Sequence, residues 1–309
     1  MKKIALYMVF FIAFTEAREF RISKQHSLSY LPLIVLEEQK IVEKNAKKAG
    51  LKDIKVSWVD ANENGADLIS SDTASFLRLW DKTEVKAVAS LDRSHIVLNS
   101  SNPRVKRLRD FTDKDKIALS KASLSALVLQ IVASKEFGIE NYDKLDRLSV
   151  DLNNFDAFTA FTSNKSEITA HVTTEPFAFI EQKNRNIHQV FNSNDLAQSG
   201  FSLHLIFASE KFYNENQEFI TIFINSLQEA NSWIKNNKKE AAKLYVKAVK
   251  ESADLIEKTL NSRSVHYDAI PVNVTFFSDF LHDTGVIGSK PKLEELFFDE
   301  IFRSKACGI

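Results

Sequence analysis

Short apolar segments alternate with longer amphipathic segments along most of the chain. The longer segments 33–49 and 123–137 carry apolar residues at helical spacing, and a glycine follows each as a stop signal. This alternation predicts βαβ units around a mainly parallel sheet, and therefore an α/β fold. The short segments have the length and composition of strands, and they cover residues 20–23, 54–59, 85–90, 96–99, 117–119, 148–152, 168–171 and 187–191.

The pattern changes after residue 218, where helical spacing predominates. Helices are predicted over residues 219–235, 239–250, 253–260, 272–282 and 293–297. A chain of 309 residues is long enough for two domains, but it contains no repeat, low-complexity tract or flexible linker. We therefore expect the chain to cross between domains through strands, at 95–98 and at 203–207. One domain would comprise residues 18–97 and 206–309, and the other residues 98–205.

The first seventeen residues have the layout of a secretory signal. A basic start, Met1-Lys2-Lys3, precedes an unbroken apolar run over residues 4–14 and a small residue at Ala17. The run is too short to span a bilayer of about 30 Å as a helix, and no cysteine follows it that would anchor a lipid. We expect an exported protein that is cleaved near Ala17 and is not inserted in the membrane; a buried strand or helix is the alternative.

Composition removes several classes of function. The 41 basic residues balance the 41 acidic ones, which gives no indication of a nucleic-acid partner. Only 7 glycines occur, so a glycine-rich phosphate loop is disfavoured. The single cysteine, Cys307, excludes a disulfide framework, and no two of the 7 histidines have metal-ligand spacing. No catalytic motif, metal site or cofactor is predicted.

Several segments in order along the chain carry a resemblance to a known family. They are residues 26–33 (HSLSYLPL), 76–83 (FLRLWDKT), 105–111 (VKRLRDF), 141–145 (NYDKL), 165–171 (KSEITAH) and 291–301 (PKLEELFFDEI). In order and spacing, they resemble the nitrate/sulfonate/taurine group of periplasmic substrate-binding proteins of ABC transporters. The resemblance runs from the first strand nearly to the C-terminus.

This resemblance implies a periplasmic-binding-protein fold of type II, with two α/β lobes joined by a hinge and a small sulfonate, nitrate, taurine or related organic solute held between them. It also implies a periplasmic monomer that acts with an ABC permease and its ATPase subunit, without a cofactor or catalysis. One alternative is a protein that binds a pyrimidine precursor of thiamine. Another is a decayed family member that acts only as an exported interaction module. The related fungal pyrimidine synthases use a histidine and a cysteine-rich motif, which this chain lacks.

Candidate ligand-binding residues lie in four loops between strands and helices. In open α/β sheets, ligands sit beyond the carboxyl ends of the strands, where helix N-termini offer free N–H groups. The alternative role for the hydroxyl residues is helix capping, and for a lysine in such a loop a solvated surface position. The candidates are Ser27 and Tyr30 in the first loop, Ser71 and Thr73 in the second, Lys121 and Ser123 in the third, and Asp156, Thr174, Glu175 and Phe177 in the fourth.

Two departures from the family pattern bear on the solute. The family usually has Ser-Pro-Pro-Phe where this chain has Thr174-Glu175-Pro176-Phe177. A carboxylate there disfavours a bare anion and makes a zwitterionic or amino-heteroaromatic ligand as plausible as a sulfonate. The chain also offers only residues 60–65 where a crossover helix is expected after the second strand. Either residues 66–70 are not the expected parallel strand or part of the first lobe has been lost, and weak or altered affinity follows as a hypothesis.

Overall fold

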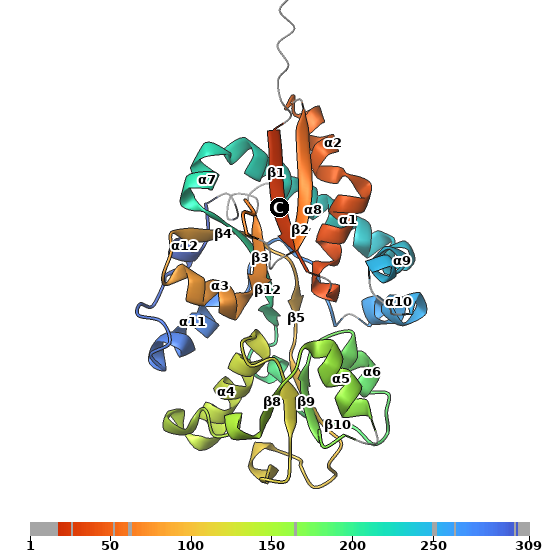
Figure 1. Cartoon of the computed structure of the whole chain (residues 1–309), viewed down its shortest axis with the longest axis vertical. Helices are drawn as coiled ribbons and strands as arrows, with labels where there is room; N and C mark the ends of the chain where they lie inside the picture. The colour runs from red at the N-terminus through yellow and green to blue at the C-terminus, as the bar shows by residue number, and fades with distance from the viewer. Residues whose placement is uncertain are drawn as a thin grey trace, which may run out of the picture.

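A computed structural model describes residues 18–25, 27–51, 53–60, 64–163, 166–248, 252–262, 264–299 and 301 (Figure 1). The predicted signal segment, Cys307 and the end of the predicted helix 239–250 lie outside these residues. The described chain forms two bodies, one above the other in Figure 1. We call the upper body lobe 1 and the lower body lobe 2. The residue boundaries given above for the two domains remain predictions.

The sheet of lobe 1 has two parts joined by one bridge. Strands β1 (Arg18–Lys24) and β2 (Ile54–Asp60) are parallel. Strand β12 (His204–Ser209) lies between β3 (Ile69–Asp72) and β4 (Val85–Ser90), antiparallel to both. A parallel bridge between Ile22 and Leu68 connects the two parts. The helices of this lobe are α1 (Leu31–Gln39), α2 (Ile41–Lys48), α3 (Thr73–Trp80), α7 (Glu210–Glu215), α8 (Gln217–Asn236), α9 (Lys238–Ala248), α10 (Ala253–Asn261), α11 (Val274–Asp283) and α12 (Leu293–Leu296).

Lobe 2 is built on one mixed sheet of five strands. Their order is β10 (His188–Asn192), β6 (Val97–Ser100), β9 (Ala170–Thr173), β7 (Ile117–Leu119) and β8 (Ser149–Asp151). The pairs β7–β8 and β7–β9 are parallel, whereas β6 is antiparallel to both of its neighbours. The helices α4 (Leu124–Phe137), α5 (Asn154–Thr162) and α6 (Phe177–Glu181) belong to this lobe.

Two segments cross between the lobes and account for every antiparallel pair among the described strands. The first contains β5 (Arg93–Ser94) and β6, and the second contains β11 (Phe201–Ser202) and β12. Strands β5 and β11 pair with each other, and Figure 1 shows β5 between the two lobes. Each pairing that runs against the parallel order of the sheets includes one of these four strands. The result is a mixed α/β architecture rather than a purely parallel one.

The predicted helix over residues 33–49 is two helices. Helix α1 begins at Leu31 with Pro32 in its first turn, a position where proline is tolerated because that N–H has no intrahelical partner. Lys40 then adopts a left-handed conformation, with a φ of 51°, and its N–H group bonds back to the carbonyls of Leu36 and Glu37. This geometry ends α1 and lets α2 start in a new direction. A lysine in this conformation is uncommon, so the sequence pattern did not reveal the break.

The short connection after β2 is possible because β3 starts near the carboxyl end of β1. Leu68 bridges to Ile22, while Asp60 at the end of β2 pairs with Lys24. Between Asp60 and Leu68 the chain therefore has to run back along the direction of β1 by only two or three residues. That distance is about 7–10 Å, much less than the length of the whole strand. Strand β3 then runs onward to pair with β12. Only Leu68 therefore bridges β1 in parallel, and Ile69–Asp72 pair with β12 instead of forming a full strand parallel to β1. Loss of part of the first lobe stays a hypothesis.

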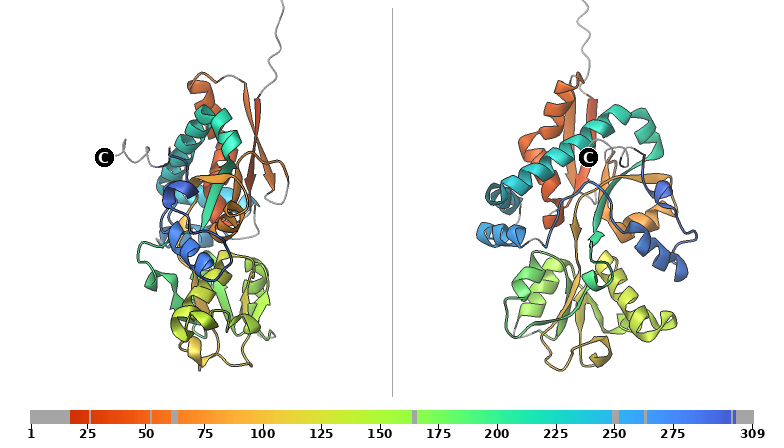
Figure 2. Two further views of the ribbon diagram at one scale, coloured as in Figure 1. Left: turned by 90° about the vertical axis from the view of Figure 1, so that its left-hand side faces the viewer. Right: turned by 180° about the vertical axis from the view of Figure 1, so that it is seen from behind.

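The face of β1 and β2 that such a crossover helix would cover is polar. Phe20 and Val56 are buried on the helical side, where Phe20 stacks on Phe219 of α8 at 3.6 Å between ring centroids. In the left view of Figure 2, the helices packed on these strands lie on one side. On the other side, the exposed side chains of Glu19 and Lys55 form an ion pair of 2.9 Å. The alternation of the two strands thus matches a sheet covered on one face only.

The buried Ser202 side chain joins the crossing segments to lobe 1. Its hydroxyl oxygen accepts bonds from the Ser90 hydroxyl and the Val272 N–H, both at 2.9 Å. Its carbonyl oxygen accepts the Thr73 hydroxyl at 2.6 Å, and its N–H donates to the Val272 carbonyl at 3.0 Å. The start of α3, the end of β4 and the segment before α11 therefore meet on one residue of β11.

Replacing this hydroxyl tests its structural role. In Ser202→Ala, the Val272 N–H loses the acceptor that Ser202 supplies, and the Ser90 hydroxyl keeps only the Asp92 carbonyl at 3.1 Å. We expect this change to lower the free energy of unfolding by about 1–3 kcal/mol. Urea denaturation of the purified protein measures the change. Ser289→Ala, at an exposed position of lobe 1, is the matched control and should change stability by less than about 0.5 kcal/mol. Equal effects of the two substitutions would contradict the assigned role.

Candidate functional site

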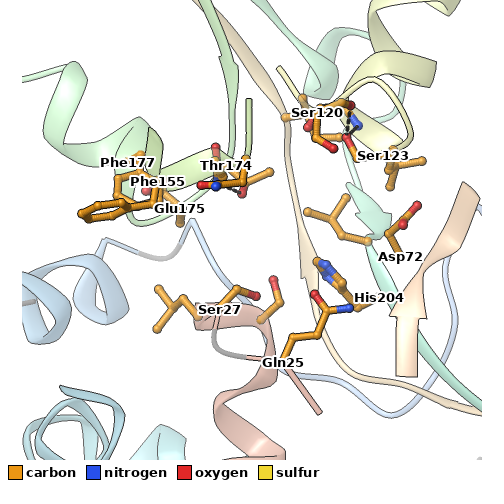
Figure 3. A pocket seen from close by; sticks show the side chains of 18 of the residues that line it. Gln25, Ser27, Asp72, Ser120, Ser123, Phe155, Thr174, Glu175, Phe177 and His204 are labelled. Carbon is orange, nitrogen blue, oxygen red and sulfur yellow. Dashed lines mark hydrogen bonds between the residues drawn. The ribbon is translucent and has the colours of Figure 1, made fainter. Parts of the chain in front are cut away.

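A cleft of about 670 Å³ lies between the lobes, with walls formed by both of them. Lobe 1 contributes the loop after β1, the start of α3 and Tyr245 of α9. Lobe 2 contributes the loops that follow β7, β8 and β9, and the crossing segments contribute Ile96, Leu203 and His204. Figure 3 shows how the labelled side chains converge on this space from opposite sides. The strand-to-helix loops meet here because the carboxyl ends of β1, β7 and β9 point to the same gap.

The start of α4 presents a group of hydroxyls to the cleft. Ser123 caps the helix by accepting the Ser125 N–H at 3.2 Å, and its own hydroxyl donates to the Ser120 carbonyl at 2.7 Å. Ser120 and Ser125 also line the cleft, and each carries a hydroxyl group. Because a helix N-terminus carries partial positive charge, this wall offers hydrogen-bond donors.

Aromatic side chains form the opposite wall in lobe 2. Phe177 at the start of α6 is buried and stacks on Phe158 of α5, with 4.7 Å between ring centroids. Phe155 packs edge-on against Phe177 at 6.3 Å and keeps 54% of its surface exposed. A phenylalanine that is half exposed inside a cleft offers apolar surface that a ligand can cover.

Glu175 places a carboxyl group beside the aromatic wall. The residue is only 7% exposed, and its Oε2 accepts the Phe179 N–H at 2.9 Å. Burial raises the pKa of Glu175 above its ordinary value of 4.5, and the bond from Phe179 and the nearby Ser264 hydroxyl oppose that shift only in part. The charge of Glu175 is therefore held in the cleft at a cost to the ligand-free protein.

On lobe 1, His204 faces the cleft from β12. Asp92 Oδ1 accepts both the backbone N–H of His204, at 3.0 Å, and a bond from its ring Nδ1, at 3.1 Å. Burial lowers the pKa of His204, but the carboxylate of Asp92, with a smaller contribution from Asp72, outweighs burial and raises it above 6.5. Asp72 itself caps α3, because its Oδ1 accepts the N–H groups of Ala74 and Ser75. This wall combines an imidazole with two carboxylates.

Five of the ten sequence candidates line the cleft: Ser27, Ser123, Thr174, Glu175 and Phe177. The Ser27 hydroxyl oxygen is buried and has no hydrogen-bond partner among the described residues, so it is free for a ligand. The Thr174 hydroxyl, directly after β9, accepts a bond from the Asn154 side chain at 3.5 Å. Whether these residues contact a solute remains a prediction.

The other five candidates lie outside the cleft lining. The Thr73 hydroxyl points inward to the Ser202 carbonyl, and the Ser71 hydroxyl donates to the carbonyl of the next residue at 3.1 Å. Tyr30 is buried in lobe 1, where its ring packs on His204 at 5.1 Å between centroids. Lys121 and Asp156 are exposed on lobe 2. None of these five residues lines the cleft in this arrangement, so the geometry does not support their predicted contacts with a ligand.

Sequence reasoning missed several lining residues, and His204 is the clearest case. It lies in a segment predicted as a crossing strand, but nothing in the local pattern indicates that Asp92 lies opposite it. Asn154 and Phe155 begin α5, directly before the candidate Asp156. Their place after a predicted strand was the available signal. Tyr245 lies on a helix with no local mark of a site.

Neither metal clusters nor membrane helices occur in the described part of the chain. No group of three or more His, Cys, Asp or Glu side chains there is placed to hold a metal ion. None of the described helices combines the length and apolarity needed to cross a bilayer.

The family model described as NMT1/THI5 like matches residues 62–241. No curated protein matches the sequence.

Among solved structures, the chain is similar to the periplasmic aliphatic sulphonate binding protein SsuA from Escherichia coli, at 17% identity and a TM-score of 0.70, covering 91% of this chain and 92% of that one. It is similar to the nitrate-binding protein NrtA from Synechocystis PCC 6803, at 12% identity and a TM-score of 0.67, over 96% and 89%. It is also similar to a Candida albicans protein with the generic periplasmic binding protein fold, at 14% identity and a TM-score of 0.61, over 92% and 93%. These likenesses confirm the predicted fold class.

The influence of Asp92 on His204 is open to a direct test. In Asp92→Asn the burial of the imidazole remains but its carboxylate partner is lost, so we expect the pKa of His204 to fall from above 6.5 to below it. Titration of the imidazole resonances by NMR measures the change. Asp283→Asn, which removes the carboxylate 3.3 Å from the exposed His282, should leave the His204 titration unchanged. An unaltered pKa in Asp92→Asn would show that Asp92 does not stabilise the imidazolium.

Glu175 should make the ligand-free protein less stable at neutral pH. Its pKa is higher in the folded state than the ordinary value of 4.5, so its ionisation costs stability as pH rises above that value. We expect Glu175→Gln to melt at a higher temperature than the parent at pH 7, with the difference vanishing below pH 4.5. Calorimetry across this range measures it; a lower melting temperature for Glu175→Gln at pH 7 is the contrary result.

Proposed function

This chain belongs to the NMT1/THI5-like family, and on that premise we propose that it captures a small organic solute between its two lobes. The observation that carries the proposal is the cleft itself, because its walls come from both lobes and from both crossing segments. A ligand that contacts both walls stabilises the arrangement in which they approach each other. Capture of this kind requires no covalent chemistry.

Opening and closing would occur around the paired strands β5 and β11. Few residues join the lobes there, and hinge closure generally concentrates backbone change in such segments. Contacts also bridge the lobes on the side of α3 and α11. Arg78 donates to the Ala122 carbonyl at 3.3 Å, Lys135 lies over the Phe276 ring at 5.7 Å, and the rings of Tyr142 and Phe280 meet at 5.8 Å. A change in lobe angle would alter these contacts, of which Tyr142, Phe276 and Phe280 are half-buried.

The wider role that we propose is that of the substrate-binding component of an ABC importer. In this role the protein is exported to the periplasm after signal cleavage and delivers its solute to a permease with an ATPase subunit. The fold of the sulphonate- and nitrate-binding proteins supports a small sulfonate, nitrate, taurine or related solute. A pyrimidine precursor of thiamine is the second candidate, and the carboxyl group of Glu175, able to accept a bond from an amino group, favours it.

Ligand screening with a measurement of shape tests the proposal. Taurine, alkanesulfonates, nitrate and aminopyrimidines are added to the protein, and melting temperature and small-angle scattering are recorded. A bound solute at 100 times its Kd should add about 2.7 kcal/mol of stability, should reduce the radius of gyration and should be recovered unchanged. If no solute of the panel changes the melting temperature or the scattering curve, the proposal is wrong. If a solute is converted to a product, the protein is an enzyme instead.

Ser27→Ala tests the site within the same assay. The substitution removes a hydroxyl that has no partner among the described residues, so stability should change little while affinity falls roughly 3- to 10-fold. Ser289→Ala, at an exposed position of lobe 1, is the matched control.

A further inference from the structure

The charged groups that line the cleft are mostly acidic. Asp72 and Glu175 carry carboxylates, and no lysine or arginine occurs among the described residues that line the space. The one basic side chain there, His204, lies between the carboxylates of Asp72 and Asp92. An anion entering this cleft would meet no unpaired cation, so the site differs from one built to hold a bare anion.

Side chains cap the N-termini of α3, α4 and α5 beside the cleft, whereas the short helical turn Leu28–Tyr30 that leads into α1 has no side-chain cap. Such termini are general anion sites because their first N–H groups have no partners. Here Asp72 accepts two of these groups in α3 with its own carboxylate, at 3.0 and 3.1 Å. Ser123 caps α4, and Asn153 accepts the Asp156 N–H of α5 at 3.0 Å. In α3 a negative charge of the protein stands where an anionic ligand would otherwise bind.

Glu175 is placed to bind a cationic group. A carboxylate has about four acceptor positions. The Phe179 N–H and the Ser264 hydroxyl occupy two of those of Glu175, so acceptor positions remain for a ligand. Figure 3 shows its side chain next to Phe155 and Phe177. A cation held by the carboxylate at this place also lies near aromatic rings, whose faces attract positive charge. Its binding would offset the cost of burying the charge of Glu175.

We propose that the solute carries a protonated amino group, which Glu175 binds, next to an apolar or aromatic portion that packs on Phe155 and Phe177. This inference rests on the proposed function and specifies the class of solute. Glu175 then determines specificity, because it attracts the ammonium group and repels a carboxylate or sulfonate in the same position.

Three probes with one apolar portion separate the alternatives. The full chain is titrated by calorimetry at pH 7 with 2-phenylethylamine, 2-phenylethanol and 2-phenylethanesulfonate, which differ only in the polar end. We expect the amine to bind at least roughly tenfold more tightly than the alcohol, as a hydrogen bond between charged groups gives, and the sulfonate to bind most weakly. Affinity for the amine should also fall as acid protonates Glu175.

Variants assign the preference to this residue. Glu175→Gln keeps the shape of the side chain without its charge and should bind the amine and the alcohol with nearly equal affinity. Glu140→Gln, an exposed carboxylate beyond the end of α4, should retain the preference of the parent. The comparison of probes on the unaltered protein does not depend on the folding of any variant.

Each contrary result is distinct. Tightest binding by the sulfonate, or a preference for the amine that survives in Glu175→Gln, overturns this inference and leaves solute capture intact. Absence of binding by all three probes also overturns it, whereas the proposed function is decided separately by the panel of solutes and the scattering measurement.

Discussion

The hydrogen bonds of Ser202 hold the architecture together at the place where the lobes join. Two strands of two residues each, β5 and β11, form the link there, and such short strands have little stability alone. Ser202 ties β11 to the end of β4, the start of α3 and the segment before α11. One of its partners, Thr73, directly follows Asp72 of the cleft wall. The link is therefore narrow, and these bonds anchor it in lobe 1.

Elements with a clear apolar pattern could be predicted from the sequence, and polar elements could not. Strands β4 (Val85–Ser90) and β7 (Ile117–Leu119) match their predicted ranges because buried apolar residues between polar ones mark them. Strand β3 contains two serines and an aspartate, and hydrogen bonds such as that from the Ser70 N–H to the Ser23 hydroxyl, at 2.8 Å, hold it instead. Pairing of this kind depends on a residue 47 positions away, which no local pattern records.

For the candidate site, too, some features could be predicted from the sequence and others could not. The loops after β1, β7 and β9 could be located by their place between strand and helix, which brought Ser27, Ser123 and Glu175 to the cleft. The direction of each side chain could not be read, so Thr73 was included although its hydroxyl points into the protein core. His204 was missed because its proximity to Asp92 arises only when chain segments 112 residues apart come together.

The one-sided cover of β1 and β2 has a consequence for how this architecture tolerates change in length. The position of β3, and with it the cleft wall at Asp72, is set by the bridge of Leu68 to Ile22 and by the pairing of β3 with β12. Neither contact involves the stretch between β2 and Leu68. Asp67 also bonds to β1, because its N–H donates to the Arg21 carbonyl and its Oδ2 accepts the Arg21 N–H, both at 2.8 Å. The chain is therefore held against β1 from residue 67 onward, and a change in length before that residue need not displace the cleft wall at Asp72.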